Sequence, residues 1–250
     1  MSLPFYVHPG VAGTSVGATV TLDGDEARHA VVVKRTQVGE RIALTDGAGT
    51  TVTGTVAEVT RSSLTVRVEE TAYAEGEHPR VVVVQAIPKG DRGELAVEML
   101  TEVGVNVIVP WAASRSVAVW KGERATKSLA RWRSTAREAA KQARRAWFPE
   151  VTELASTADV AALVAGASLA VVLHEAADLP LAQVRVPEQG TLLLVVGPEG
   201  GLADEELAAL GGAGAGVVHL GAEVLRTSTA GVGAVAALLS RTARWGDLRG

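Results

Sequence analysis

The most informative stretch of this sequence is Val195-Val196-Gly197-Pro198-Glu199-Gly200-Gly201, followed by Leu220-Gly221-Ala222-Glu223-Val224-Leu225-Arg226-Thr227-Ser228-Thr229-Ala230. Each glycine cluster ends an apolar run and precedes a segment with helical periodicity. A strand that ends in glycine-rich backbone presents free N–H groups, and the missing Cβ atoms let a ligand come close. Two such loops side by side predict one composite pocket.

The segments around these loops predict an α/β domain. From Arg80 onward, strand-like runs alternate with helical patterns. The runs at 169–174 and 191–196 are continuously apolar, which is typical of strands buried on both faces. A shorter run at 217–220 precedes a helix expected at 228–239. This order favours a parallel sheet with helices packed against it.

The first part of the chain has a different character. Short clusters of β-forming residues lie between glycine and aspartate turns, so we expect a small barrel or curled sheet. The polar segment 72–79 lacks periodicity and is the expected linker, which divides the chain into domains at 1–75 and 76–250. The expected strands are 17–22, 41–45, 51–56 and 64–68, with one helix at 25–34.

Composition narrows the class of protein. The chain has 250 residues, of which 47% are hydrophobic, enough for a buried core. No window approaches about 18 uninterrupted apolar residues, and the N-terminus lacks a secretion pattern, so we expect a cytosolic protein without a membrane span. The absence of cysteine excludes disulfides and thiolate ligands, and the five histidines have no ligand spacing. We therefore expect no metal site.

Charge is distributed unevenly along the chain. The net charge is only −4, yet 115–145 contains ten Lys and Arg against two Glu. By contrast, 146–225 contains one Arg against eleven Asp and Glu. Such a split indicates a localised surface for a polyanion on an otherwise acidic protein.

The basic segment predicts a helix at about 125–144. Leu129, Trp132 and Ala136 recur at helical spacing and form an apolar face. Carboxylates that would form i,i+4 pairs are almost absent, so repulsion on the cationic face favours an anionic partner. A solvated helix surface and a nucleic-acid contact both remain open. The cationic face comprises Lys127, Arg131, Arg137, Lys141 and Arg144.

The loop at 197–201 also has two interpretations. It could be a plain strand-to-helix turn, with Asp204 near the helix N-terminus. It is neither a Gly-x-Gly-x-x-Gly dinucleotide motif nor a P-loop. The acidic residues at 204–206 would repel a phosphate, which favours a ligand with little negative charge.

Arg226 directly precedes a Thr-Ser-Thr run that can cap the last helix. It could simply pair with Glu199 or Glu223, with Thr227 as a helix cap. Alternatively, an arginine beside two glycine loops is suited to contact a carbonyl or phosphate oxygen.

At this point the sequence resembles the RsmE family of ribosomal RNA methyltransferases, members of the SPOUT class. The motifs are individually weak, but their joint order is specific and runs nearly end to end. The loops at 197–201 and 225–230 complete the match. The other matching segments are 5–7, 29–35, 38–40, 46–49, 85–92, 101–105, 114–116 and 138–142, with Arg145 and Pro149.

The resemblance implies S-adenosylmethionine-dependent methylation of N3 of a uridine in 16S ribosomal RNA by a homodimer. It implies a PUA-like RNA-binding barrel at 1–75 and a methyltransferase domain at 76–250, whose last strands and helix form a trefoil knot. The substrate is 16S ribosomal RNA or the assembled small ribosomal subunit. The implied cofactor-binding residues are Leu173, His174, Gly197, Pro198, Glu199, Gly200, Gly201, Leu220, Gly221, Leu225, Arg226, Thr227, Thr229 and Ala230.

Two side chains are candidates for catalysis. We expect Arg226 to stabilise charge on a uracil carbonyl oxygen. Glu199 is the candidate general base, although solvent could take the proton instead. N3 lies on the Watson–Crick edge, so the uridine must be unpaired or flipped out. The cations expected to contact RNA phosphates are Lys34, Arg35, Lys89, Arg92, Arg115, Lys141 and Arg145.

Two other classes of protein are weighed against this hypothesis. A non-catalytic RNA-binding module would keep the barrel and the basic helix without a working pocket. An oxidoreductase on a dinucleotide-binding sheet would need a glycine fingerprint and a ribose-binding acid, neither of which the sequence contains.

Overall fold

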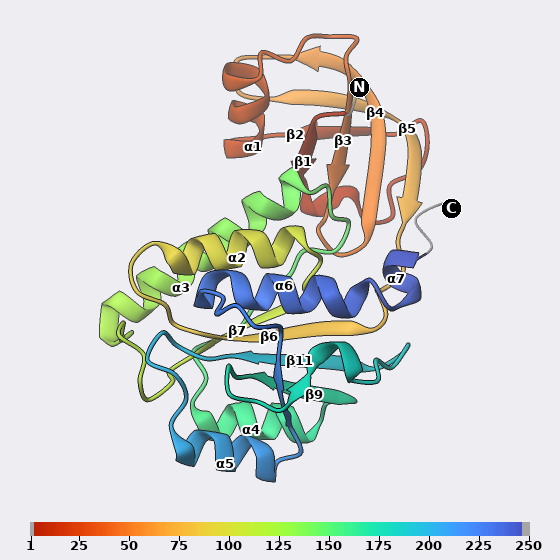
Figure 1. The fold of residues 1–250 in the computed structure, drawn as a ribbon. Helices are drawn as coiled ribbons and strands as arrows, with labels where there is room; N and C mark the ends of the chain where they lie inside the picture. Colours follow the sequence, from red (N-terminus) through yellow and green to blue (C-terminus); the bar gives the residue numbers. More distant parts are fainter. Residues whose placement is uncertain (1–2, 247–250) are drawn as a thin grey trace. The chain divides into compact units, whose positions relative to one another are not determined.

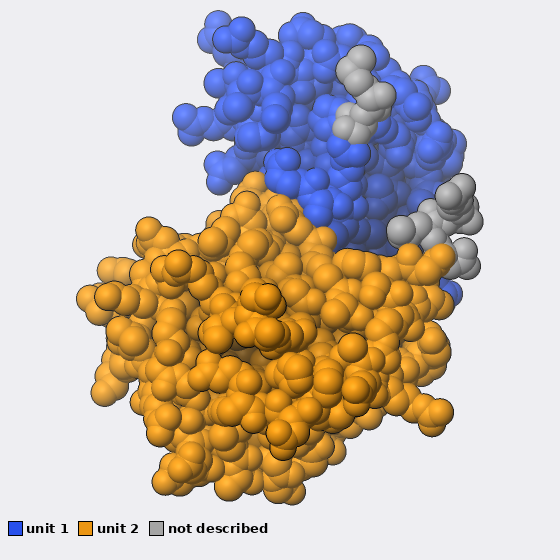
Figure 2. Space-filling model, in the orientation of Figure 1, with its two compact units in different colours: residues 1–76, 140–148 blue, residues 77–139, 149–250 orange. Residues whose placement is uncertain are grey.

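The computed structural model describes residues 3–246, which form two compact units (Figure 2). Unit 1 comprises 1–76 together with 140–148, and unit 2 comprises 77–139 together with 149–250. The segment 140–148, which begins within the last turn of the basic helix, therefore belongs to the first unit. The first boundary falls within the expected linker 72–79, but residues 72 and 73 belong to the strand Leu64–Tyr73 and are not linker. The return of the chain to unit 1 has no signal in the local pattern.

Unit 1 is built on a five-stranded sheet of order β1-β3-β4-β5-β2 (Figure 1). The pair β1 and β3 is parallel, and the other neighbours are antiparallel. Alternate residues of the strands enter one core, in which Ile42, Leu44 and Leu64 are fully buried. The strands are β1 (Phe5–Val7), β2 (Thr19–Leu22), β3 (Arg41–Thr45), β4 (Thr50–Val59) and β5 (Leu64–Tyr73).

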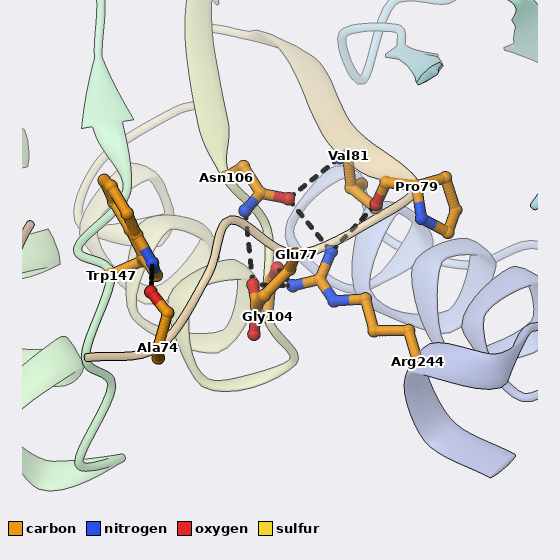
Figure 3. A network of polar contacts seen from close by, with 8 residues as sticks. All are labelled: Ala74, Glu77, Pro79, Val81, Gly104, Asn106, Trp147 and Arg244. Atoms are coloured by element: carbon orange, nitrogen blue, oxygen red, sulfur yellow. Dashed lines mark hydrogen bonds and ion pairs between the residues drawn. The ribbon is translucent and has the colours of Figure 1, made fainter. Parts of the chain in front are cut away.

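The helical part of unit 1 departs from the expected helix at 25–34. An α-helix, α1 (Gly24–Arg28), continues into a single π-helical turn at His29–Val33. The segment 140–148 is held by polar contacts within the unit. The indole Nε1 of Trp147 donates to the carbonyl oxygen of Ala74 at 2.8 Å (Figure 3).

Unit 2 contains a seven-stranded parallel sheet of order β10-β12-β9-β11-β6-β7-β8. The parallel α/β domain predicted from the apolar runs is therefore confirmed. The central run 191–196 is a strand with the predicted ends. The strands are β6 (Arg80–Ala86), β7 (Val107–Trp111), β8 (Glu150–Val151), β9 (Leu169–Leu173), β10 (Leu179–Pro180), β11 (Thr191–Val196) and β12 (Gly216–His219).

Helices cover both faces of this sheet. In Figure 1, α2, α3 and α6 lie on one face, and α4 and α5 lie on the other. Strand β11 shows why its sequence is continuously apolar: Leu192 and Leu194 enter the first core, whereas Leu193 and Val195 enter the second. The helices are α2 (Arg92–Glu102), α3 (Gly122–Gln142), α4 (Thr157–Ala165), α5 (Asp204–Gly212), α6 (Thr227–Leu239) and α7 (Ala243–Gly246).

A buried arginine ties the end of unit 2 to its first strand (Figure 3). The side chain of Arg244 is only 6% exposed, and its Nη1 donates to Pro79 O at 3.1 Å and to Asn106 Oδ1 at 2.9 Å. Its Nη2 contacts the Glu77 carboxylate and Gly104 O. Burial lowers the pKa of Arg244, and the charge of Glu77 opposes this shift.

No helix within residues 3–246 is long and apolar enough to span a bilayer. In the same part of the chain, no group of three or more His, Asp or Glu side chains is arranged to hold a metal ion.

Candidate functional site

Three strands of unit 2 end side by side at the carboxyl edge of the sheet. Leu173, the last residue of β9, is in register with Val196 of β11 and Val218 of β12. The N–H of His174 continues this pairing by donating to Val218 O at 2.9 Å. Because ligands of open parallel sheets bind outside the carboxyl ends of strands, this edge is the candidate site.

The loop after β11 is a tight turn that packs on a neighbouring loop. The N–H of Gly201 donates to Pro198 O at 3.0 Å, and Gly201 has a φ of +71°, which glycine adopts without strain. A Cβ on Gly200 would lie 2.9 Å from Arg115 O. A side chain at position 200 would therefore push the two loops apart.

The second glycine loop leads into α6. Arg226 is the N-cap of this helix, and its carbonyl oxygen accepts the N–H groups of Thr229 and Ala230, both at 2.9 Å. Thr227, the alternative candidate for the cap, is instead buried inside the first turn. Its carbonyl oxygen accepts from the side-chain amide of Gln85 at 3.3 Å, which joins α6 to the end of β6.

The start of α6 also lies against β11. A Cβ on Gly231 would be 3.2 Å from Cγ2 of Val196, so helix and strand are in close contact. Val196 directly precedes the loop at 197–201. The structure thus brings the two glycine loops, with the end of β9, to one edge of the sheet.

The backbone at this edge has free hydrogen-bonding capacity. Within residues 3–246, the N–H groups of 221–225 donate no hydrogen bond. Residues 221–226 are exposed, and Leu173 and Leu220 are half-buried beside them. Free amides next to aliphatic side chains suit a ligand that combines an apolar ring system with hydrogen-bond acceptors.

The two candidate catalytic residues differ in their contacts. Arg226 is exposed and forms no ion pair with Glu199, Glu223 or any other carboxylate of the described chain. Glu199 accepts a hydrogen bond from the backbone N–H of Lys89 at 3.3 Å, through Oε1. This contact connects the loop after β11 with the loop after β6.

Sequence reasoning did not find two buried residues that organise this edge. Glu206, 5% exposed, accepts from Ser114 N at 2.8 Å through Oε1 and from Ala203 N at 3.0 Å through Oε2. Gln85, fully buried, contacts Thr227 as described above. A glutamate three residues after a helix N-cap is a recognisable signal, but its bond to Ser114 depends on tertiary contact.

Six of the seven cations expected to bind RNA are at least partly exposed. Lys34, Arg35, Lys89 and Arg92 are exposed. Arg115 is exposed, but its Nη1 donates to Leu202 O at 3.0 Å, so it also supports the loop after β11. Arg145 is half-buried.

Lys141 requires a correction. Its side chain is 8% exposed, and its Nζ lies 2.9 Å from Oε1 of Glu26, which is itself mostly buried. A buried ammonium with a buried carboxylate partner is not available to a phosphate. We therefore remove Lys141 from the expected RNA contacts.

More of the positive charge on the basic helix is paired with carboxylates than its sequence indicates. Arg131 pairs with Glu94 at 3.2 Å, and Arg133 pairs with Glu153 at 2.9 Å. Both carboxylates come from outside α3, where an i,i+4 analysis of the helix alone cannot detect them.

Comparison with known proteins identifies the family. A family model described as an RNA methyltransferase domain matches residues 76–239, and a model described as an RNA methyltransferase PUA domain matches residues 22–69. A ribosomal RNA small subunit methyltransferase E from Mycobacterium bovis is 44% identical over 92% of this chain and 89% of its own length. This chain belongs to the ribosomal RNA small subunit methyltransferase E family. The family resemblance of the motifs is therefore confirmed.

More distant relatives and solved structures match this chain over similar lengths. The methyltransferase E from Bacillus subtilis is 29% identical over 90% of this chain and 91% of its own. The crystal structure of the methyltransferase E from Neisseria gonorrhoeae bound to S-adenosylmethionine has a TM-score of 0.84 and 27% identity, covering 96% of this chain and 98% of that one. A structure from Thermotoga maritima described as a predicted RNA methyltransferase has a TM-score of 0.68 and 25% identity, covering 95% and 98%.

Proposed function

We propose that this protein methylates N3 of a uridine in 16S ribosomal RNA, with S-adenosylmethionine as the methyl donor. One observation in a chain of this family carries the proposal. The loops at 197–201 and 220–226, which follow β11 and β12, lie at one edge of the sheet, and the second loop has free backbone amides. The Neisseria gonorrhoeae relative, crystallised with S-adenosylmethionine, supports this choice of cofactor.

The residues at this edge fit such a cofactor. The free amides at 221–225 suit the acceptor atoms of a nucleoside and an amino-acid tail, and Leu173 and Leu220 suit the apolar ring. The cofactor does not need to be bound through a phosphate, so the negative charge of residues 204–206 does not argue against its binding. The proposed binding residues are Leu173, His174, Gly197, Pro198, Glu199, Gly200, Gly201, Leu220, Gly221, Leu225, Arg226, Thr227, Thr229 and Ala230.

When bound, the cofactor supplies an activated methyl group. The chain's own contribution is alignment of the base and stabilisation of charge. Arg226, which has no carboxylate partner in the described part of the chain, is free to donate to a uracil carbonyl oxygen as N3 loses its proton. Glu199 is the proposed proton acceptor and is already oriented by the Lys89 amide.

RNA recognition is assigned to exposed cations and to the first domain. The family match at 22–69 supports a PUA-like RNA-binding barrel within 1–75, and the remainder, 76–250, is the proposed methyltransferase domain with a trefoil knot. We propose a homodimer that acts in the cytoplasm on 16S ribosomal RNA or the assembled small subunit. The proposed phosphate contacts are Lys34, Arg35, Lys89, Arg92 and Arg115, with Arg145 as a partly buried member.

Two measurements test the proposal. Calorimetry with S-adenosylmethionine should give saturable heat, whereas a non-catalytic RNA-binding module would give none. Mass spectrometry of 16S ribosomal RNA should then show one 3-methyluridine that is absent in cells lacking the protein and restored by the wild-type chain. Methylation at a different atom or on a different RNA would contradict the proposed specificity.

A further inference from the structure

A cavity lies at the same edge of the unit 2 sheet. It has a volume of about 400 Å³, within the range of small-ligand sites. The loops after β6 and β7 and the first turns of α2 and α3 enclose it. Its walls include Ile87, Pro88, Gly93, Trp120, Arg124 and Trp132.

Two buried indoles in this cavity have unused donors. Trp120 and Trp132 are 9% and 2% exposed and meet edge to face, with ring centroids 5.0 Å apart. Within residues 3–246, neither Nε1 donates a hydrogen bond, whereas Nε1 of Trp111 donates to Thr157 Oγ1 at 3.3 Å. Neither nitrogen is among the fully buried unpaired polar atoms of the described chain, so both N–H groups are accessible to a ligand that brings its own acceptor.

A glycine keeps one of these donors accessible. A Cβ on Gly93 would lie 2.8 Å from Nε1 of Trp132. Gly93 is in the first turn of α2, where alanine would otherwise favour the helix by about 1 kcal/mol. The sequence thus has the less favourable helical residue at the position where a side chain would cover the indole N–H.

The charge at the rim favours an anionic ligand. Arg124 lines the cavity and has no carboxylate partner in the part of the chain that the structure describes. Arg131 also lines it, but pairs with Glu94 at 3.2 Å. Exposed Lys89 adjoins the lining residues Pro88 and Gly90. A ring with carbonyl acceptors on a phosphate backbone matches both the donors and the cation.

The cavity adjoins the proposed methyl-donor site. Strand β6, whose loop forms one wall, pairs with β11, and Lys89 N lies 3.3 Å from Oε1 of Glu199. We propose that this cavity holds the target pyrimidine nucleotide, with the indole N–H groups of Trp120 and Trp132 donating to carbonyl oxygens of the base and Arg124 contacting its phosphate. This inference rests on the proposed RNA methylation and assigns the position of its acceptor.

The experiment monitors the indole N–H resonances of full-length protein labelled with ¹⁵N-tryptophan. Signals are assigned with the variants Trp120→Phe and Trp132→Phe. Uridine 5′-monophosphate should shift both signals saturably and leave that of Trp111 in place. Inorganic phosphate at the same concentration should shift neither. Equal shifts with phosphate alone would contradict base recognition.

Two variants distinguish recognition of the base from recognition of the phosphate. Arg124→Gln should weaken uridine 5′-monophosphate about tenfold, or about 1.4 kcal/mol, without changing the affinity for uridine. Gly93→Ala should abolish the shift of Trp132, whereas Gly211→Ala, at a helical glycine with open space, should have no effect. Melting temperatures check that the variants are folded. The titration of the wild-type protein tests the proposal even if a variant fails to fold.

Further outcomes overturn the inference. Indole signals that respond to protein concentration and not to nucleotide would show that a second copy covers the cavity. Saturable S-adenosylmethionine heat and RNA methylation, combined with no nucleotide effect on Trp120 and Trp132, would reject the cavity assignment and leave the proposed function intact. Absence of methylation would instead reject the proposed function.

Discussion

The buried carboxylate of Glu206 accepts a hydrogen bond from the backbone N–H of Ser114 at 2.8 Å. Its other oxygen accepts from Ala203 N at 3.0 Å, at the N-terminus of α5. One side chain thereby joins the loop after β7 to the segment that follows the glycine loop at 197–201. Arg115 reinforces the junction through Leu202 O. The position of the glycine loop therefore depends on contacts outside the loop itself.

We predict that Glu206→Gln weakens S-adenosylmethionine binding more than it slows the chemical step. The amide nitrogen of glutamine would face one of the two backbone N–H groups and leave it without an acceptor, at a cost of about 1–3 kcal/mol. Calorimetry and steady-state kinetics should show an increased cofactor Kd and KM with a small change in kcat. Glu205→Gln, at the exposed neighbouring position, is the control; an equal effect there would contradict a specific role for Glu206.

Arg226→Ala should reduce kcat about 100-fold, the usual effect of removing one donor to a developing oxyanion. Cofactor affinity should fall much less than kcat, since the assigned partner of the guanidinium is the base and Arg226 is only one of the proposed cofactor-binding residues. Single-turnover methylation and calorimetry measure the two quantities separately. Arg185→Ala, at an exposed arginine elsewhere in unit 2, should be silent. Equal losses of rate and affinity would make Arg226 a cofactor-binding residue only.

Arg244→Met should lower the free energy of unfolding by about 3 kcal/mol. The substitution leaves the Glu77 carboxylate, Asn106 Oδ1 and two carbonyl oxygens without their shared donor. The matched control is Arg80→Met, whose partner Glu150 is 3.8 Å away between largely exposed side chains. That change should cost less than about 1 kcal/mol in denaturant unfolding. Similar costs for the two variants would refute the importance of burial.

Gly49→Ala should destabilise unit 1. Gly49 has a φ of +101°, and a Cβ there would lie 2.8 Å from ring atoms of Trp147 and Tyr73. Strain in the backbone and the clash should together cost at least about 2 kcal/mol. Hydrogen exchange should show faster opening of β4 and β5. Gly76→Ala, where a Cβ meets nothing within 4 Å, should leave exchange unchanged.

The N-terminus of α4 should become less stable in acid. Hydrogen bonds from the side chain and then the backbone of Ser156 lower the pKa of Asp159 below its ordinary value. Because the folded-state pKa is the lower one, this stabilisation is present above the ordinary pKa and disappears as the pH falls through the folded value. NMR titration of the Asp159 carboxyl carbon should show the low midpoint, and Ser156→Ala should raise it. An unchanged midpoint would contradict the capping role.

Several features follow from the sequence alone, because they depend on neighbouring residues. The continuous apolar run of β11 indicates burial on both faces, and the glycines at 197–201 and 221 mark sharp exits from strands. The ordered motifs were also sufficient to identify the family. These signals are local periodicity and local backbone freedom, which the amino-acid order expresses directly.

Contacts between distant residues, in contrast, depend on how the whole chain folds. The tertiary structure joins 140–148 to unit 1 and pairs Lys141 with Glu26, which removes one expected RNA contact. It also brings the Glu206 carboxylate within hydrogen-bond distance of Ser114 N, and Gly93 beside the indole of Trp132. The physical reason is that burial and hydrogen-bond partners arise between segments far apart in the chain, where neither helical nor strand periodicity carries information.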